Sequence, residues 1–341
     1  MKNAINRWRA TWNPDMYHGW GMSKRYFEGW YVKIVDDTEG YALALIPGIS
    51  MGRDGNHHAF IQTIDGKKGE TTYHKFPVSD FQPSEKGFEL RIGENEFSAH
   101  HIKIHLPDIK GELTFENLTP WTPMLGAPGI MGWFSFVPFM ECYHGVVSLN
   151  HHIRGSLNIK GNEINFTNGL GYIEKDWGVS FPNAYIWMQT NHFFDKNKAL
   201  VKQPNNQAQQ EISLIASVAN IPFLGTHFIG YIVGFWFKNK LYRFATYTGA
   251  KMIAQINGRH IRLAFKDSKN RLEIDAHQAE TGSLIYPING EMVGKLNESL
   301  KATIKVRFYE KEALVFEGEG RNAGLEAAGN VDILLTEKWR R

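Results

Sequence analysis

The sequence has almost no cysteine, and this limits how the fold can be stabilised. Cys142 is the single cysteine among 341 residues, so an intrachain disulfide is excluded and the redox compartment is left open. The chain carries 38 Lys and Arg against 35 Asp and Glu, with no run of five basic residues. A net charge of +3 over this length gives no footprint for nucleic acid, and we expect none as a partner.

Motifs of several common enzyme classes are absent as well. The chain contains no HExxH or CxxC metal motif, no GxSxG nucleophile elbow and no P-loop. Adjacent histidines such as His57 and His58 would point to opposite faces of a strand, and His101 and His105 would lie about 13 Å apart along one. We therefore predict no metal and no cofactor, which leaves cofactor-free chemistry or ligand binding.

The first residues give no targeting signal. Residues 1–14 contain charges and a proline but no apolar core, unlike a secretory signal. Asp15 follows almost at once, which argues against a transit peptide. The expected location is cytoplasmic, compatible with peripheral membrane contact, and the oligomeric state is left open.

What the sequence does contain is one strand pattern after another. Hydrophobic residues make up 43% of the chain and aromatic residues 13%, which suits a β-rich fold. Residues 31–46 have the pattern of a hairpin around a turn at 36–40. Residues 302–308 alternate apolar and polar side chains, as in a half-buried antiparallel strand. The sequence therefore predicts an all-β fold built of barrels or sandwiches.

Residues 212–237 contain no charged side chain and are long enough to span a bilayer. Because Asn220, Pro222 and Gly225 interrupt the segment, we predict two buried strands in a chain that needs no detergent. An apolar tip at 222–224 that touches a membrane is an alternative. Residues 202–211 are predicted to form a polar loop.

The segment 169–193 is the most informative part of the chain. Glu174 and Asp176 lie two residues apart and precede Trp177, and a second period-2 series follows. Its members are Tyr185, Trp187, Gln189, Asn191 and Phe193. Residues two apart share one face of a strand, and buried polar groups need partners. The pattern therefore predicts the polar wall of a pocket.

Two interpretations of the acids remain open at this stage. Burial raises the pKa of a carboxyl group, so that Glu174 or Asp176 can donate a proton near neutral pH. Trp177 can then stabilise positive charge through its ring face. Alternatively, both acids pair with Lys175, Lys33 or Arg25 and only hold the strands together.

Two further clusters are candidates for the site. Glu28 and Trp30 form a matching acid and aromatic pair, although Glu28 can equally cap a barrel end by accepting backbone N–H groups. Tyr143 or His144 can deprotonate a phenol, although such a pair beside a core strand is more often merely hydrogen-bonded.

Three blocks of this sequence resemble the tocopherol cyclase family. Residues 23–33 read SKRYFEGWYVK, residues 169–182 read GLGYIEKDWGVSFP, and residues 132–145 read GWFSFVPFMECYHG. The last block is similar to bacterial members. The resemblance implies two tandem lipocalin-like β-barrel domains, shared with carotenoid hydratases and some Diels–Alder-type cyclases. We place them at residues 1–160 and 161–341, with 169–193 opening the second run of strands.

The family's activity is the cofactor-free, acid-catalysed closure of a chromanol ring from a prenylated hydroquinone, an isomerase reaction. The resemblance implies Asp176, Glu174 and Tyr172 as catalytic residues, with Gln189 and Asn191 orienting the hydroquinone oxygens. The remaining predicted substrate contacts are Glu28, Trp30, Trp177, Trp187, Tyr143 and His144. The expected partner is a small apolar or prenylated aromatic ligand, and a quinone or another isoprenoid is as plausible as a tocopherol precursor. The alternatives are a non-catalytic carrier of an apolar ligand and an isoprenoid hydratase.

Overall fold

The chain forms two compact units, each with its own β-sheet. The structure is a computed structural model that describes residues 1–195, 211–223, 225–279 and 282–340. The first unit comprises residues 1–181 and 283–296, and the second comprises residues 182–282 and 297–341. The predicted division after residue 160 stays a prediction.

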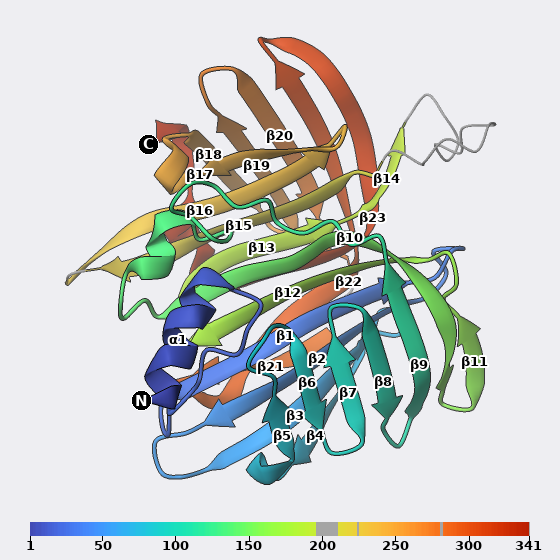
Figure 1. The fold of residues 1–341 in the computed structure, drawn as a ribbon. Coiled ribbons are helices and arrows are strands. Elements are labelled where there is room, and N and C mark those ends of the chain that lie inside the picture. The colour runs from blue at the N-terminus through green and yellow to red at the C-terminus, as the bar shows by residue number, and fades with distance from the viewer. Residues whose placement is uncertain (196–210, 224, 280–281, 341) are drawn as a thin grey trace. The chain divides into compact units, whose positions relative to one another are not determined.

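The first sheet is antiparallel and lies in the first unit (Figure 1). Its strand order is β4-β3-β2-β1-β12-β10-β9-β8-β7-β6-β5, with β11 paired to β10. The strands are β1 (Tyr26–Val35), β2 (Ala42–Met51), β3 (His57–Asp65), β4 (Glu70–Phe76), β5 (Phe81–Pro83), β6 (Glu89–Ile92), β7 (Asn95–Ser98), β8 (His101–His105), β9 (Ile109–Glu116), β10 (Cys142–Ile159), β11 (Asn162–Asn165) and β12 (Leu170–Gly178). The helical elements of this unit are α1 (Lys2–Trp12), η1 (Val78–Asp80) and η2 (Gly132–Phe136).

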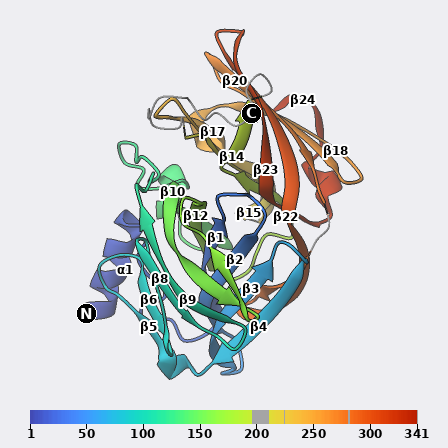
Figure 2. The same ribbon diagram turned by 90° about the vertical axis from the view of Figure 1, so that its right-hand side faces the viewer.

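The first sheet is strongly curved and encloses its own apolar core. Figure 2 shows β5 to β9 facing β1 to β4 across the unit. One buried apolar cluster contains residues from both halves of the strand order. Val32 and Ile61 come from β1 and β3, and Phe97 and Leu113 come from β7 and β9. Trp30 stacks on Phe88 with ring centroids 5.1 Å apart. Since one strand face is buried in this core, the alternation of side chains places the other face on the opposite side of the sheet.

The second sheet is also antiparallel, with the order β17-β16-β15-β13-β23-β22-β20-β19-β18-β24; β14 pairs with β23, and β21 with β22. The strands are β13 (Ala184–Thr190), β14 (His192–Asp195), β15 (Ser213–Phe223), β16 (Thr226–Phe237), β17 (Lys240–Ala245), β18 (Lys251–Asn257), β19 (His260–Lys266), β20 (Asn270–His277), β21 (Gly282–Ile288), β22 (Glu291–Glu310), β23 (Ala313–Gly329) and β24 (Thr336–Arg340). Two short helical turns, η3 (Thr246–Thr248) and η4 (Val331–Leu334), accompany them. Its apolar core contains residues such as Met188, Phe235, Phe265 and Phe308.

The all-β prediction is confirmed, with two antiparallel sheets. Closure of each sheet into a barrel stays a prediction. The predicted hairpin at 31–46 is β1 and β2, and residues 302–308 alternate between buried and outward-facing side chains as expected. In the described part of the chain, α1 is the one α-helix, and the strand patterns did not indicate it.

Two segment predictions have different outcomes. The uncharged segment 212–237 forms the paired strands β15 and β16, as predicted. No helix in the described residues has the length and apolar character needed to cross a bilayer. Leu224 at the predicted apolar tip and residues 202–210 of the predicted polar loop lie outside the described residues.

The expectation that 169–193 opens the second sheet is wrong for its first half. β12 pairs with β1 and β10 in the first sheet, and only β13 and β14 belong to the second. Gly178 ends β12 with φ of +149°, a backbone conformation that favours glycine. The first period-2 series therefore lies on β12 of the first sheet, and the second lies along β13 and β14 of the second sheet.

Candidate functional site

β12 carries the predicted acids on the face of the first sheet opposite its core. Ile173 and Trp177 belong to the apolar core cluster, so Tyr172, Glu174 and Asp176 point to the other side. Asp176 is the register partner of His144 on β10. Side chains of directly opposed residues lie side by side, and the pairing therefore adds His144 to the row of acids.

His144 lies between the two carboxylates. Its Nδ1 is 2.7 Å from Asp176 Oδ1, within hydrogen-bond distance. Its Nε2 is 3.2 Å from Glu174 Oε2, which is an ion-pair contact rather than an aligned hydrogen bond. The Tyr172 hydroxyl donates to the same Glu174 oxygen at 2.5 Å. These four residues, which we call the His-acid cluster, form one connected group.

Exposure distinguishes the two acids. The side chain of Glu174 is 4% exposed, whereas that of Asp176 is 26% exposed. Tyr172 is fully buried, and His144 is nearly so. The cluster thus has a buried end at Tyr172 and an accessible end at Asp176, where a reacting group or water can approach.

The acids determine the charge of His144. Burial alone would lower the pKa of His144, but Asp176 and Glu174 outweigh that effect and raise it to about 10. Burial and the neighbouring Glu174 raise the pKa of Tyr172 well above its usual value. At neutral pH, His144 is therefore an imidazolium and Tyr172 a neutral hydroxyl donor.

A pH prediction follows for His144. Its folded pKa lies above its unfolded value of about 6.5, so its contribution to stability is complete below pH 6.5 and is lost as pH rises through 10. We expect the free energy of unfolding to fall more steeply from pH 7 to 10 in the wild type than in His144→Gln. Urea denaturation of both proteins across this range measures the difference. Lys175, whose pKa burial lowers, is present in both proteins and does not contribute to the difference, so parallel curves would contradict the assignment.

The same cluster has the donors that a metal ion requires. One ligand atom each from His144, Glu174 and Asp176 lies within 4.8 Å of the others, close enough to contact one divalent cation. Both imidazole nitrogens already face carboxylate oxygens. A bound cation would replace these contacts, and the absence of a metal stays a prediction.

Glu28 lies on the core face of the sheet, away from the His-acid cluster. Its carboxylate accepts the backbone N–H groups of His18 and Gly19, at 2.9 and 3.2 Å, and the Tyr26 hydroxyl. It also pairs with the fully buried Lys175. The capping interpretation of Glu28 therefore describes its contacts, and a substrate role stays a prediction.

Lys175 satisfies all its donors inside the unit. Its ammonium group donates to Met16 O at 2.5 Å, to His18 Nδ1 at 3.1 Å and to Glu28 Oε1. It also lies 4.5 Å from the ring centroid of Trp30 and 4.7 Å from that of Trp177, within the range of cation–π attraction. We call Lys175, Glu28 and His18 the Lys-Glu cluster. Its hydrogen bonds and ion pair connect residues 15–19 with β1 and β12.

The pKa shifts agree with a fixed ion pair. Burial alone would raise the pKa of Glu28, but Lys175 and His18 outweigh it and lower it to about 2. Burial, followed by the charge of Lys175, lowers the pKa of His18 to about 4. A neutral His18 can accept the Lys175 proton at Nδ1, which matches the observed contact.

Protein groups surround Trp177. His18 stacks on its ring at 3.9 Å, and Tyr143 lies nearly parallel at 5.5 Å. The Tyr143 hydroxyl donates to Val137 O at 2.7 Å. In this arrangement Tyr143 connects β10 with residues 137–140. Roles for Trp30, Trp177 and Tyr143 in substrate binding stay predictions.

The second period-2 series belongs to the second unit. Ile186 and Met188 of β13 are in its apolar core, so Tyr185, Trp187 and Gln189 point to the opposite face. The Tyr185 hydroxyl donates to Glu326 at 2.8 Å. Asn191 follows β13 and is buried. The predicted contacts of Trp187, Gln189 and Asn191 with substrate stay predictions.

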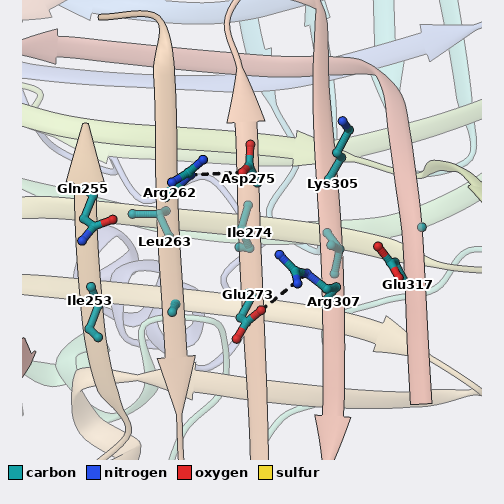
Figure 3. Close-up of a pocket in the computed structure, with 13 residues that line it drawn as sticks. Ile253, Gln255, Arg262, Leu263, Glu273, Ile274, Asp275, Lys305, Arg307 and Glu317 are labelled. Atoms are coloured by element: carbon teal, nitrogen blue, oxygen red, sulfur yellow. Dashed lines mark hydrogen bonds and ion pairs between the residues drawn. The ribbon is translucent and has the colours of Figure 1, made fainter. Parts of the chain in front are cut away.

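An open groove lies on the polar face of the second sheet (Figure 3). Charges of opposite sign alternate across its strands, with Arg262 Nε 3.2 Å from Asp275 and Arg307 Nε 3.5 Å from Glu273. These side chains are partly exposed and neutralise one another. The groove is therefore a poor match for an apolar ligand, and we assign it no role.

Sequence reasoning missed the central position of His144 and the Lys-Glu cluster. His144 meets Asp176 across 32 residues, and Lys175 meets Glu28 across 147. A strand pattern gives side-chain direction but not strand partners, so neither pairing has a local signal. The one available hint was Lys175 itself, an ionisable residue flanked by acids on an otherwise apolar strand face.

Comparison with known proteins identifies relatives. A family model described as tocopherol cyclase-like matches residues 107–329. A probable chloroplastic tocopherol cyclase from Oryza sativa subsp. japonica is 23% identical over 208 residues, which cover 58% of this chain and 42% of that protein. A chloroplastic tocopherol cyclase from Zea mays is 20% identical over 205 residues, which cover 60% and 40%. The chain thus spans about two fifths of the length of these relatives.

Solved structures share the fold. A crystal structure of CghA with Sch210972 matches with a TM-score of 0.54 and 11% sequence identity, covering 89% of both chains. A second CghA structure matches with a TM-score of 0.52 and 10% identity over the same share of each chain. At such low identity the likeness concerns the fold alone.

Proposed function

The chain belongs to the tocopherol cyclase-like family, and on that premise we propose that it cyclises a prenylated hydroquinone, or a related isoprenoid, by acid catalysis. One observation carries the proposal: the buried imidazole ring of His144 lies between the carboxyl groups of Glu174 and Asp176. Perturbed ionisable groups gathered in one place are typical of catalytic sites.

The proposed reaction begins with a proton from Asp176. Asp176 takes the proton from Nδ1 of the His144 imidazolium and transfers it to the trisubstituted alkene of the prenyl chain, which leaves a tertiary carbocation, a neutral His144 and the Asp176 carboxylate. The phenolic oxygen attacks the cation and forms the C–O bond of the chromanol ring. The phenolic proton then returns through the Asp176 carboxylate to His144. No atom is gained or lost, so the reaction needs no cofactor.

The geometry supports Asp176 as the donor and Glu174 as its support. Asp176 is the accessible acid, whereas Glu174 is buried and accepts the Tyr172 hydroxyl. The imidazolium of His144 faces Asp176 through Nδ1, so it can supply the proton that Asp176 delivers. Glu174 and Tyr172 act as positioning residues, because they hold His144 charged and in place.

From the family resemblance, we also propose that Trp187, Gln189 and Asn191 contact the substrate. Amide groups suit the hydroquinone oxygens, and the indole ring suits the prenyl chain. Exclusion of water would protect the carbocation from hydration. A hydratase would share the protonation step and admit water as the nucleophile.

Product analysis of the full chain with a prenylated hydroquinone tests the proposal. We expect a chromanol of the same mass as the substrate, formed at an unchanged rate in the presence of EDTA. A product heavier by one water would identify a hydratase instead. Substrate recovered unchanged, although bound, would identify a carrier, and loss of turnover with EDTA would indicate a metal at the His-acid cluster.

A further inference from the structure

Helix α1 presents its apolar side chains outward. At about 100° per residue, Met1, Ile5, Trp8 and Trp12 fall within about 60° of one another on the helix. All four are exposed, and Trp8 is 67% exposed. The residues that face the body of the unit are instead Asn6 and Ala10. Surface helices normally bury their apolar stripe, so this orientation is inverted.

A second exposed apolar segment adjoins the helix in the same unit. The Trp12 ring lies 5.0 Å from that of Phe136 in η2. Trp133 and Phe139 are exposed as well, and Phe139 is 97% exposed. Figure 1 shows α1 at the N-terminal end of the chain, beside the first sheet. We call Ile5, Trp8, Trp12, Trp133, Phe136 and Phe139 the aromatic patch.

The backbone holds the patch in this form. Phe139 has a φ of +65°, a strained conformation for a bulky residue. The Tyr143 hydroxyl accepts the Met140 N–H at 3.3 Å and donates to Val137 O. At the helix end, the Asn13 amide donates to Lys86 O at 3.3 Å. Phe139 is therefore kept outward by contacts on both sides.

Basic side chains predominate on the helix, and one acid, Glu85, lies close to it. α1 carries Lys2, Arg7 and Arg9 and no acid, and residues 117–140 contain no charged side chain. Lys2 pairs with Glu85 at 2.6 Å, and both arginines are exposed. Exposed Trp and Phe beside basic residues match the interface of a bilayer with anionic lipids.

We infer that the aromatic patch is a docking surface for an anionic lipid bilayer. The helix lies on the membrane with its apolar stripe among the acyl chains, and Arg7 and Arg9 contact lipid phosphates. This surface is independent of the proposed reaction, since it lies on other residues and needs no substrate.

Vesicle co-sedimentation of the full chain tests the inference. The wild type is expected to bind vesicles of phosphatidylcholine mixed with phosphatidylglycerol, and to bind phosphatidylcholine alone more weakly. Binding should fall at about 1 M salt, where the Debye length is about 3 Å. Trp8→Ser combined with Phe139→Ser should lower the association constant by at least about tenfold. Arg7→Glu combined with Arg9→Glu should abolish the preference for anionic vesicles.

The matched control combines Val293→Ser with Leu314→Ser, which removes exposed apolar side chains outside the patch. It should bind like the wild type, and thermal melts should show that all variants are folded. Equal binding by the patch variants and the wild type would overturn the inference, as would binding with no dependence on lipid charge. Light scattering gives a further outcome. If the wild type forms dimers but does not bind vesicles, and the patch variants are monomers, the patch would instead be a contact between two copies of the chain.

Discussion

Asp176→Asn is expected to lower turnover of a prenylated hydroquinone by on the order of 10²–10⁴-fold, the usual cost of losing a general acid. The amide oxygen can still accept the Nδ1 proton of His144, so the contact observed at 2.7 Å is retained. The amide cannot deliver a proton to the alkene. Fold and ligand binding should therefore remain, and single-turnover kinetics with parallel binding measurements can separate the two.

Glu174→Gln is the informative neighbour of this variant. It retains an acceptor for the Tyr172 hydroxyl but removes one of the two charges that hold His144 protonated. We expect turnover to fall less than in Asp176→Asn. As pH rises, we expect activity to be lost at a lower pH than in the wild type, because His144 then releases its proton more easily. Glu96→Gln, on an exposed strand position, is the control. Unchanged turnover in both acid variants, together with a lower melting temperature, would assign the acids to scaffolding.

Lys175→Met is expected to destabilise the protein by about 3–5 kcal/mol, the usual cost of breaking a buried ion pair. Lys175 and Glu28 are both fully buried, so the substitution leaves a carboxylate in the core without its cation. The N-terminal segment should loosen, because the N–H groups of His18 and Gly19 donate to Glu28. Urea denaturation measures the loss of stability, and hydrogen exchange at these two amides measures the local effect.

Combining Lys175→Met with Glu28→Gln should recover part of the lost stability, since the unpaired charge is then absent. Lys160→Met, which breaks an exposed pair with Glu70, should leave the melting temperature nearly unchanged. A similarly small effect of Lys175→Met would contradict the role of the Lys-Glu cluster in fastening residues 15–19.

Local patterns were sufficient to predict the strands and the side-chain directions within them. The alternation in 302–308 and the hairpin at 31–46 depend on neighbouring residues, and both are observed. Glu174 and Asp176 share a face because strands have a period of two. The three sequence blocks at residues 23–33, 132–145 and 169–182 correctly indicated the family to which the chain belongs.

Strand partners and the helix could not be predicted in the same way. β12 lies between β1 and β10. Its paired residues on β1 are more than a hundred positions away in the sequence, and those on β10 are about thirty positions away. Helix α1 has no side-chain N-cap, and its apolar stripe faces away from the core, so neither usual helix signal was present. His144 became central only through the register of β10.

The first unit is discontinuous in the sequence, and this affects its folding during synthesis. Residues 283–296 complete the unit formed by residues 1–181: Ser50 donates to Gly290 O, and Gln62 exchanges hydrogen bonds with Ile285. The 101 residues from 182 to 282 must be translated before this closing segment exists. At about 5–20 residues per second, the ribosome needs roughly 5–20 s for them. During that interval the nascent first unit lacks its last pieces, and a chaperone has time to bind it.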